Sequence, residues 1–195
     1  GTLDIDDSIT LERFVQSGGI LSALNNNDIT ITEQFAQTEA GQIATGGSVD
    51  IVDLSGGVTV TAMDVGGDLG IESLGSDGIE QVEDGAIEVL GHTQVRARDG
   101  SAAPAGVRLD ARANDFSTIF IDGGTVALTD ASALILDGLI ATGDLDVAVG
   151  TGGVAGGISQ TREIQVDVST SFAADTQLLQ EAVLSRSDNI FAGPI

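Results

Sequence analysis

Acidic side chains carry most of the chemistry that this sequence could perform. The chain of 195 residues holds 30 Asp and Glu against seven Lys and Arg, which gives a formal charge of −23. Two acid pairs, Asp4 with Asp6 and Asp144 with Asp146, are spaced by two residues. On a β-strand such side chains share one face, roughly 7 Å apart. Because Ca²⁺ prefers oxygen ligands, these four residues are the candidates for a calcium site.

Paired carboxylates also serve glycoside hydrolysis, which needs two of them about 5 to 9 Å apart. A sugar-cleaving enzyme usually stacks its substrate on aromatic rings, and this chain has no Trp and no Tyr. It also lacks the Asp-x-Asp-x-Asp-Gly loop and the glycine-rich nonapeptide of known calcium folds. We therefore predict no metal and no cofactor, with a carbohydrate-active enzyme and a Ca²⁺-dependent binding module as the alternatives.

Other catalytic or nucleotide-binding signals are weak. The segment Gly150–Ala155 matches the spacing G-x-G-x-x-A, but a strand-like run at 164–168 follows it where a dinucleotide site needs a helix. A P-loop is excluded because the chain contains no Lys. The only histidine, His92, is matched by Ser169 in the internal repeat described next, so we interpret it as a surface residue. The sequence predicts no catalytic residue and no enzymatic activity.

The elements that carry these residues recur with a fixed period of about 77 residues, which is typical of repeat architectures. Ile87–Ala97 aligns without a gap on Ile164–Ala174. Three further matches have the same spacing to within two residues: Gly46–Val49 on Gly123–Val126, Gly78–Gln81 on Gly157–Gln160, and Asn114–Phe116 on Asn189–Phe191. We expect a single segment of a longer repeat protein, with units at 3–86, 87–163 and an incomplete 164–195.

Short runs inside each unit alternate apolar and polar residues, as half-buried strands do. Examples are Val49–Leu54, Val58–Ala62 and Leu145–Val149. Glycine pairs between the runs indicate turns, because Gly tolerates positive φ. Four turns of about 19 residues would fill one unit, so we predict an all-β parallel β-solenoid of about ten turns whose repeat equivalents stack on one wall. An immunoglobulin-like sandwich is disfavoured because it usually contains a buried Trp and a Tyr.

The alternation also predicts a core and an outer face. Arg96 and Arg98 should point outward and pair with Asp residues of adjacent turns. Two segments, Thr10–Gln16 and Asp175–Leu184, could form short helices instead of strands. The predicted inward-facing residues are Val89, Val95, Leu109, Phe116, Val166, Phe172 and Phe191.

Charge and hydropathy exclude some partners. A surface of charge −23 repels nucleic acid, and no apolar run is long enough to insert into a membrane. The absence of Cys does not distinguish a reducing compartment from a secreted protein.

A family resemblance emerges from a series of glycine-, aspartate- and aliphatic-rich motifs. They are Asn114–Phe116, Gly123–Ala131, Ala133–Leu136, Ala141–Leu145, Gly152–Gly153 and Gly157–Gln160. From about residue 78 to residue 195, the chain resembles filamentous-haemagglutinin-like adhesins and related giant bacterial surface proteins built from β-strand repeats. The resemblance implies a right-handed parallel β-helix, secretion, and adhesive or structural work at a bacterial cell surface. The expected partners are neighbouring repeats of the same chain, other copies stacked end to end, and surface glycans or proteins.

Overall fold

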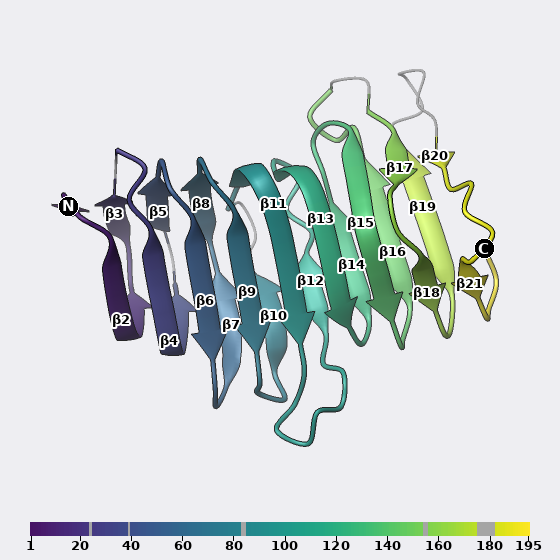
Figure 1. The fold of residues 1–195 in the computed structure, drawn as a ribbon, viewed down its shortest axis with the longest axis horizontal. Helices are drawn as coiled ribbons and strands as arrows, with labels where there is room; N and C mark the ends of the chain where they lie inside the picture. Colours follow the sequence, from purple (N-terminus) through teal and green to yellow (C-terminus); the bar gives the residue numbers. More distant parts are fainter. Residues whose placement is uncertain (24, 39, 83–84, 154–155, 175–181) are drawn as a thin grey trace.

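The chain winds into a parallel β-solenoid whose two ends carry the two termini (Figure 1). The computed structural model describes residues 1–23, 25–38, 40–82, 85–153, 156–174 and 182–195. Within these ranges the regular elements are strands and there is no helix. Thr10–Gln16 lies within a strand, so the helical alternative for it is wrong. Most of the second candidate helix, residues 175–181, lies outside the described residues.

Three walls of parallel strands surround the core. Wall 1 contains β1 (Thr2–Asp4), β3 (Gly19–Ala23), β5 (Gly41–Thr45), β8 (Ala62–Val65), the first parts of β11 (Ile87–Ala97), β13 (Asp115–Gly123) and β15 (Leu134–Ala141), then β17 (Ile158–Gln160) and β20 (Ala182–Val183). Wall 2 contains the first parts of β2 (Ile9–Gln16) and β4 (Ile29–Gln37), β6 (Val49–Asp53), β9 (Leu69–Ser73), the second parts of β11, β13 and β15, then β18 (Ile164–Val166) and β21 (Ile190–Phe191). Wall 3 contains the second parts of β2 and β4, β7 (Gly57–Val60), β10 (Gly78–Gln81), β12 (Val107–Leu109), β14 (Val126–Thr129), β16 (Leu145–Val149) and β19 (Thr170–Ala174).

One turn visits the three walls once, and the solenoid has about eight turns of about 21 residues. Turn length varies along the chain: Ser48 follows its ladder partner Asp28 by 20 residues, whereas Arg108 follows its register partner Glu80 by 28 residues. The longest turn contains the loop between β11 and β12, which extends away from the walls in Figure 1. The turns predicted from the sequence were too short and too many, because corner loops add residues that strand patterns do not reveal.

The sequence repeat and the spatial turn have different periods. Val49 lies on wall 2, whereas its equivalent Val126 lies on wall 3. Ile87 lies on wall 1, whereas its equivalent Ile164 lies on wall 2. One sequence repeat spans ten strand segments among the described residues, while each turn uses three. Equivalent residues are therefore rotated by a third of a turn, and the prediction that they stack on one wall is wrong.

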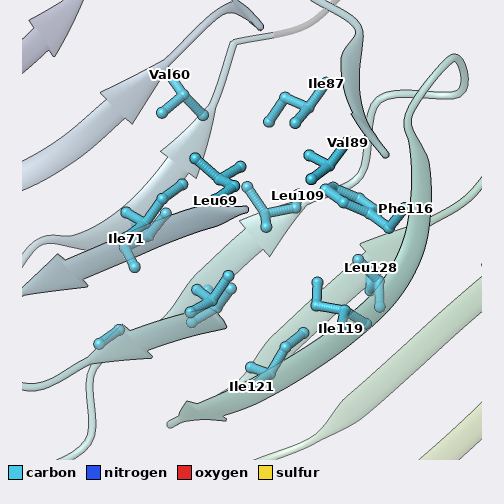
Figure 2. Packing of buried hydrophobic residues seen from close by; sticks show 14 of the residues in the cluster. Val60, Leu69, Ile71, Ile87, Val89, Leu109, Phe116, Ile119, Ile121 and Leu128 are labelled. Carbon is cyan, nitrogen blue, oxygen red and sulfur yellow. The ribbon is translucent and has the colours of Figure 1, made fainter. Parts of the chain in front are cut away.

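Aliphatic side chains from all three walls fill the interior. Figure 2 shows Val60, Leu109 and Leu128 of wall 3 meeting side chains of the other two walls. Burying such side chains is worth roughly 1.5 to 3 kcal/mol each. Five predicted core residues are buried: Val89, Val95, Leu109, Phe116 and Val166. Phe172 and Phe191, near the carboxyl-terminal end, pack against the core but are only partly buried.

Glycine pairs at the corners allow neighbouring turns to approach closely. A Cβ on Gly66 would lie 2.7 Å from the carbonyl oxygen of Gly46, and one on Gly67 would lie 2.8 Å from the carbonyl carbon of Gly47. Neither Gly66 nor Gly67 has a positive φ. At Gly66–Gly67 the physical reason is therefore lack of space between stacked backbones. The pair Gly18–Gly19 has the positive φ that was predicted, at 112° and 81°.

A ladder of short polar side chains joins five successive turns at the corner between walls 1 and 2. Each step is a backbone N–H donating to a side-chain oxygen of the neighbouring turn, at 2.8 to 3.0 Å. The ladder residues are Ser8, Asp28, Ser48, Asp68 and His92. Because the corner backbone cannot pair completely within a sheet, these side chains satisfy N–H groups that strand pairing leaves over.

Two buried or half-buried clasps, each made of one Gln and one Asn, also connect adjacent turns. Asn114 donates to Gln81 Oε1 and accepts from Gln81 Nε2, both at 2.7 Å. Its Oδ1 also accepts from the N–H of Ile87 at 2.9 Å. One repeat later, Asn189 and Gln160 exchange the same two bonds at 2.7 and 2.8 Å, and Asn189 Oδ1 accepts from the N–H of Ile164. The polar residues shared between repeats thus hold turns together.

Candidate functional site

The four acids proposed as calcium ligands lie in two distant places. Asp4 and Asp6 belong to the first turn. Asp144 and Asp146 belong to the seventh turn, where Asp144 lies at the corner before β16 and Asp146 lies in β16. All four side chains are largely exposed, and Asp144 accepts a hydrogen bond from the Ser169 hydroxyl. Across the described part of the chain, no group of three or more His, Cys, Asp or Glu residues is arranged to hold a metal ion. The absence of a specific calcium site stays a prediction.

The outward-facing arginines behave in two ways. Arg98 pairs with Asp122 of the next turn, which confirms the predicted pairing. Arg96 has a different neighbour: its guanidinium carbon lies 5.8 Å from the centre of the Phe120 ring, in cation–π contact. The side-chain amide of Gln94 lies against the Arg96 guanidinium on the outer face of β11. Arg96 is thus held over an aromatic face rather than by a carboxylate.

Around Arg96 lies a group of polar and aromatic side chains on the outer face, which we call the wall 2 cluster. Five residues line a cavity of about 110 Å³: His92, Gln94, Arg96, Phe120 and Arg162. Strand β11 supplies the first three, and period-two alternation puts Gln94 and Arg96 on its outer face. Phe120 is the register partner of Gln94 on β13, so it lies one turn further along.

The Phe120 ring is fixed from its other side by the next turn. A Cβ on Gly138 would come within 3.1 Å of the ring, and the nearby Arg162 Cβ would be 3.5 Å away. Gly138 has a φ of +97°, a conformation that other residues rarely adopt. This glycine lets the ring lie across the backbone between Arg96 and Arg162.

Asp137 forms the acidic edge of the cluster. Its Oδ2 lies 3.2 Å from His92 Nε2 and 3.0 Å from Arg162 Nη2, while Thr161 donates to its Oδ1. The hydrogen bond from Thr161, followed by the charges of Arg162 and His92, lowers the pKa of the Asp137 carboxyl below its ordinary value. Asp137 therefore stays ionised near neutral pH and offsets part of the positive charge.

The order of these groups does not suit nucleophilic catalysis. In a hydrolytic triad the imidazole lies between the hydroxyl and the carboxylate, so that it can take the hydroxyl proton. Here the carboxylate of Asp137 lies between Thr161 and His92. A carboxylate of lowered pKa is also a weak base. The cluster is better suited to binding than to proton transfer.

Sequence reasoning missed this cluster as a unit. His92 and Asp137 are 45 residues apart, and only the turn lengths of the solenoid bring them together. The predicted outward direction of Arg96 was the one usable signal, since it placed a cation on a known face. No local motif indicated that Phe120 or Arg162 would be its neighbours.

One buried acid outside the cluster, Asp130, has a raised pKa. Asp130 is fully buried at the corner after β14, where its oxygens accept from the N–H groups of Phe116 at 2.7 Å and Ser132 at 2.8 Å. Burial raises the pKa of Asp130 to about 6, although these two bonds oppose the shift. Asp53 makes the corresponding corner bonds one repeat earlier, to Phe35 and Ser55 at 3.0 Å. Both residues are structural corner acids.

Comparison with known proteins adds one match. Residues 46–121 and 123–195 each match the model of a family described as repeats of unknown function (DUF5649). The second match begins one repeat period after the first, which confirms the period found by internal comparison. No curated protein and no solved structure matches the chain. The described residues include no helix long and apolar enough to cross a membrane.

Proposed function

The chain belongs to the DUF5649 family of repeats of unknown function, and from that premise we propose that it is a stiff structural segment, a spacer or fibre piece, of a large bacterial repeat protein. The observation that carries the proposal is the continuity of the three walls, which run through every complete turn. Each turn pairs with its neighbours through the strands of the three walls, and the corner ladder or a clasp reinforces many of these junctions, so bending the rod would break several bonds together.

The amino-terminal face of the described solenoid is apolar, as a surface that another turn covers would be. At the amino-terminal end a cavity of about 370 Å³ is lined by apolar side chains, among them Leu3, Phe14 and Leu21. The Phe14 ring stacks on Phe35 of the next turn at 5.7 Å and has no turn on its other side among the described residues. Another turn of similar cross-section, from the same chain or a second copy, would cover this surface and pair the exposed strand edges.

The proposed location is the exterior or surface of a bacterial cell, where the segment would carry adhesive modules toward glycans or proteins. The resemblance to giant surface repeats supports this part of the proposal. An acidic surface also supports it, because charge keeps an elongated protein dispersed. We propose no catalytic role, since the one His–Asp–Thr group described has the wrong order for a nucleophilic triad.

The spacer proposal is tested by lengthening the rod. A second copy of residues 46–122 inserted after residue 122 adds ten strand segments, which corresponds to about 16 Å at the usual strand spacing. Small-angle scattering should show the maximum dimension increasing by about that amount with an unchanged cross-section. A chain that gains mass without gaining length, or that thickens, would contradict the proposal. Light scattering across a salt series tests stacking separately, because salt shortens the range of charge repulsion to about 8 Å at 0.15 M.

A further inference from the structure

The wall 2 cluster contains donors that the solenoid itself does not use. Arg162 and His92 share the Asp137 carboxylate, which compensates the charge of Arg162. Arg96 forms no ion pair with any carboxylate in the described residues. Its register partner Asp122 on β13 is paired with Arg98, while Glu72, its register partner on β9, and Asp50 lie on its β9 side. Arg96 and Gln94 both line the cavity.

The repeat framework does not require these side chains. The positions one repeat after His92, Gln94 and Arg96 are Ser169, Ser171 and Ala173. All three are small; Ser169 directly precedes β19, and the other two lie in it. The corner acid and the clasp are kept in both repeats, whereas the cluster occurs in one. The corner acid and the clasp therefore belong to the framework of the solenoid, whereas the cluster is a feature of the outer face in one repeat.

The cavity is preorganised for a small anion. The guanidinium of Arg96 lies over the Phe120 ring, so less rotamer freedom would be lost on binding than for an unsupported arginine. A planar guanidinium suits the bidentate recognition of a carboxylate or sulfate. The cavity of about 110 Å³ is partly open to solvent, so a small oxyanion group can enter it while the rest of a larger molecule stays outside.

The rest of the surface limits the ligand further. A chain of charge −23 repels a polyanion over its length, while a single acidic group meets mainly its immediate neighbours. We propose that the wall 2 cluster binds one small oxyanion, a carboxylate or sulfate group, either free or carried by an acidic sugar residue. This binding is separate from the spacer role and does not depend on it.

The test is a titration followed by ¹⁵N–¹H NMR of the whole chain at constant ionic strength. The probes are sodium sulfate, sodium acetate and galacturonic acid, with galactose as the neutral comparison. We expect saturable shifts at the backbone amides of residues 92–96 and 120 with the three anions and none with galactose. If the natural ligand is a free anion, acetate and galacturonic acid should bind with equal affinity. If it is carried by an acidic sugar residue, galacturonic acid should bind at least tenfold more tightly.

Matched variants separate this site from general charge effects. Arg96→Gln should raise Kd at least tenfold, while Arg108→Gln, which removes the same charge from wall 3, should leave it unchanged. Arg96→Lys keeps the charge without the planar fork and should give an intermediate Kd. Circular dichroism confirms that each variant folds. Shifts that fail to saturate up to about 0.1 M anion, or that persist equally in Arg96→Gln, would overturn the proposal.

Discussion

The clasp of Gln81 and Asn114 and the clasp of Gln160 and Asn189 make the same bonds in different surroundings. Asn114 is fully buried, with complete turns on both sides. Asn189 is only half-buried and lies in the last, partial turn. A hydrogen bond that leaves a buried group unpaired when lost costs more than one whose partner can turn to water. Identical bonds in this repeat protein should therefore differ in energetic value along the rod.

The largest difference is expected at the phenylalanine two residues after each Asn. Phe116→Ala removes a fully buried ring and should lower the free energy of unfolding by about 3 to 5 kcal/mol. Phe191→Ala removes a half-buried ring and should cost about 1 kcal/mol, since less apolar surface returns to water. Urea denaturation measures both. Equal losses would show that the end turn is as tightly packed as the middle.

The clasps themselves should differ by somewhat less. Asn114→Ala leaves the side chain of Gln81 and the N–H of Ile87 without their partner in the core, which should cost about 2 to 4 kcal/mol. Asn189→Ala should cost about 1 kcal/mol or less, because water reaches Gln160. Hydrogen exchange adds a local readout: the Ile87 amide should lose protection in the first variant. If both variants lose equal stability, burial does not determine how much a clasp contributes to the free energy of unfolding.

A smaller effect is expected from the corner acids, measured as a pH dependence. The pKa of Asp130 is raised to about 6 from about 3.8, so the folded state holds its proton more tightly than the unfolded state. This contribution to stability is fully present below about pH 3.8 and is lost as pH rises through 6. It amounts to about 3 kcal/mol at most, at about 1.4 kcal/mol per pKa unit.

One variant isolates that contribution from the other carboxyl groups. Asp130→Asn should remove part of the loss of stability between pH 4 and pH 7. Urea midpoints at a series of pH values provide the comparison. A wild-type slope in Asp130→Asn would assign the pH dependence to other acids.

Much of the architecture was predictable because it depends on local patterns. Alternation marked the strands and the buried side of residues such as Val95 and Leu109, and the internal period identified a repeat fold. The wall to which each strand belongs was not predictable, because it depends on corner loops whose lengths differ from turn to turn. One unpatterned loop, between β11 and β12, is enough to lengthen a turn and displace every later residue along the walls.

The wall 2 cluster was unpredictable for the same reason. Arg96, Phe120 and Arg162 come from three turns of unequal length, so their meeting follows from the summed lengths of the intervening loops. The clasps lay between these extremes. Alignment of Gln81 with Gln160 and of Asn114 with Asn189 showed that polar residues recur, but not that they bond to each other across adjacent turns.

The most direct test of the account concerns the unequal turns and the three walls. Asp146 and Ser171 are register partners on wall 3, while Gln165, which is closer to Asp146 along the sequence, lies on wall 2. The chain contains no Cys, so paired substitutions are unambiguous. Neighbouring strands are about 4.8 Å apart, within the Cα range that a disulfide can bridge. Under mild oxidation, mass spectrometry should detect a disulfide in the Asp146→Cys/Ser171→Cys variant and none in Asp146→Cys/Gln165→Cys. The reverse result would restore the short, even turns expected from the sequence and contradict the rotation of the repeats around the three walls.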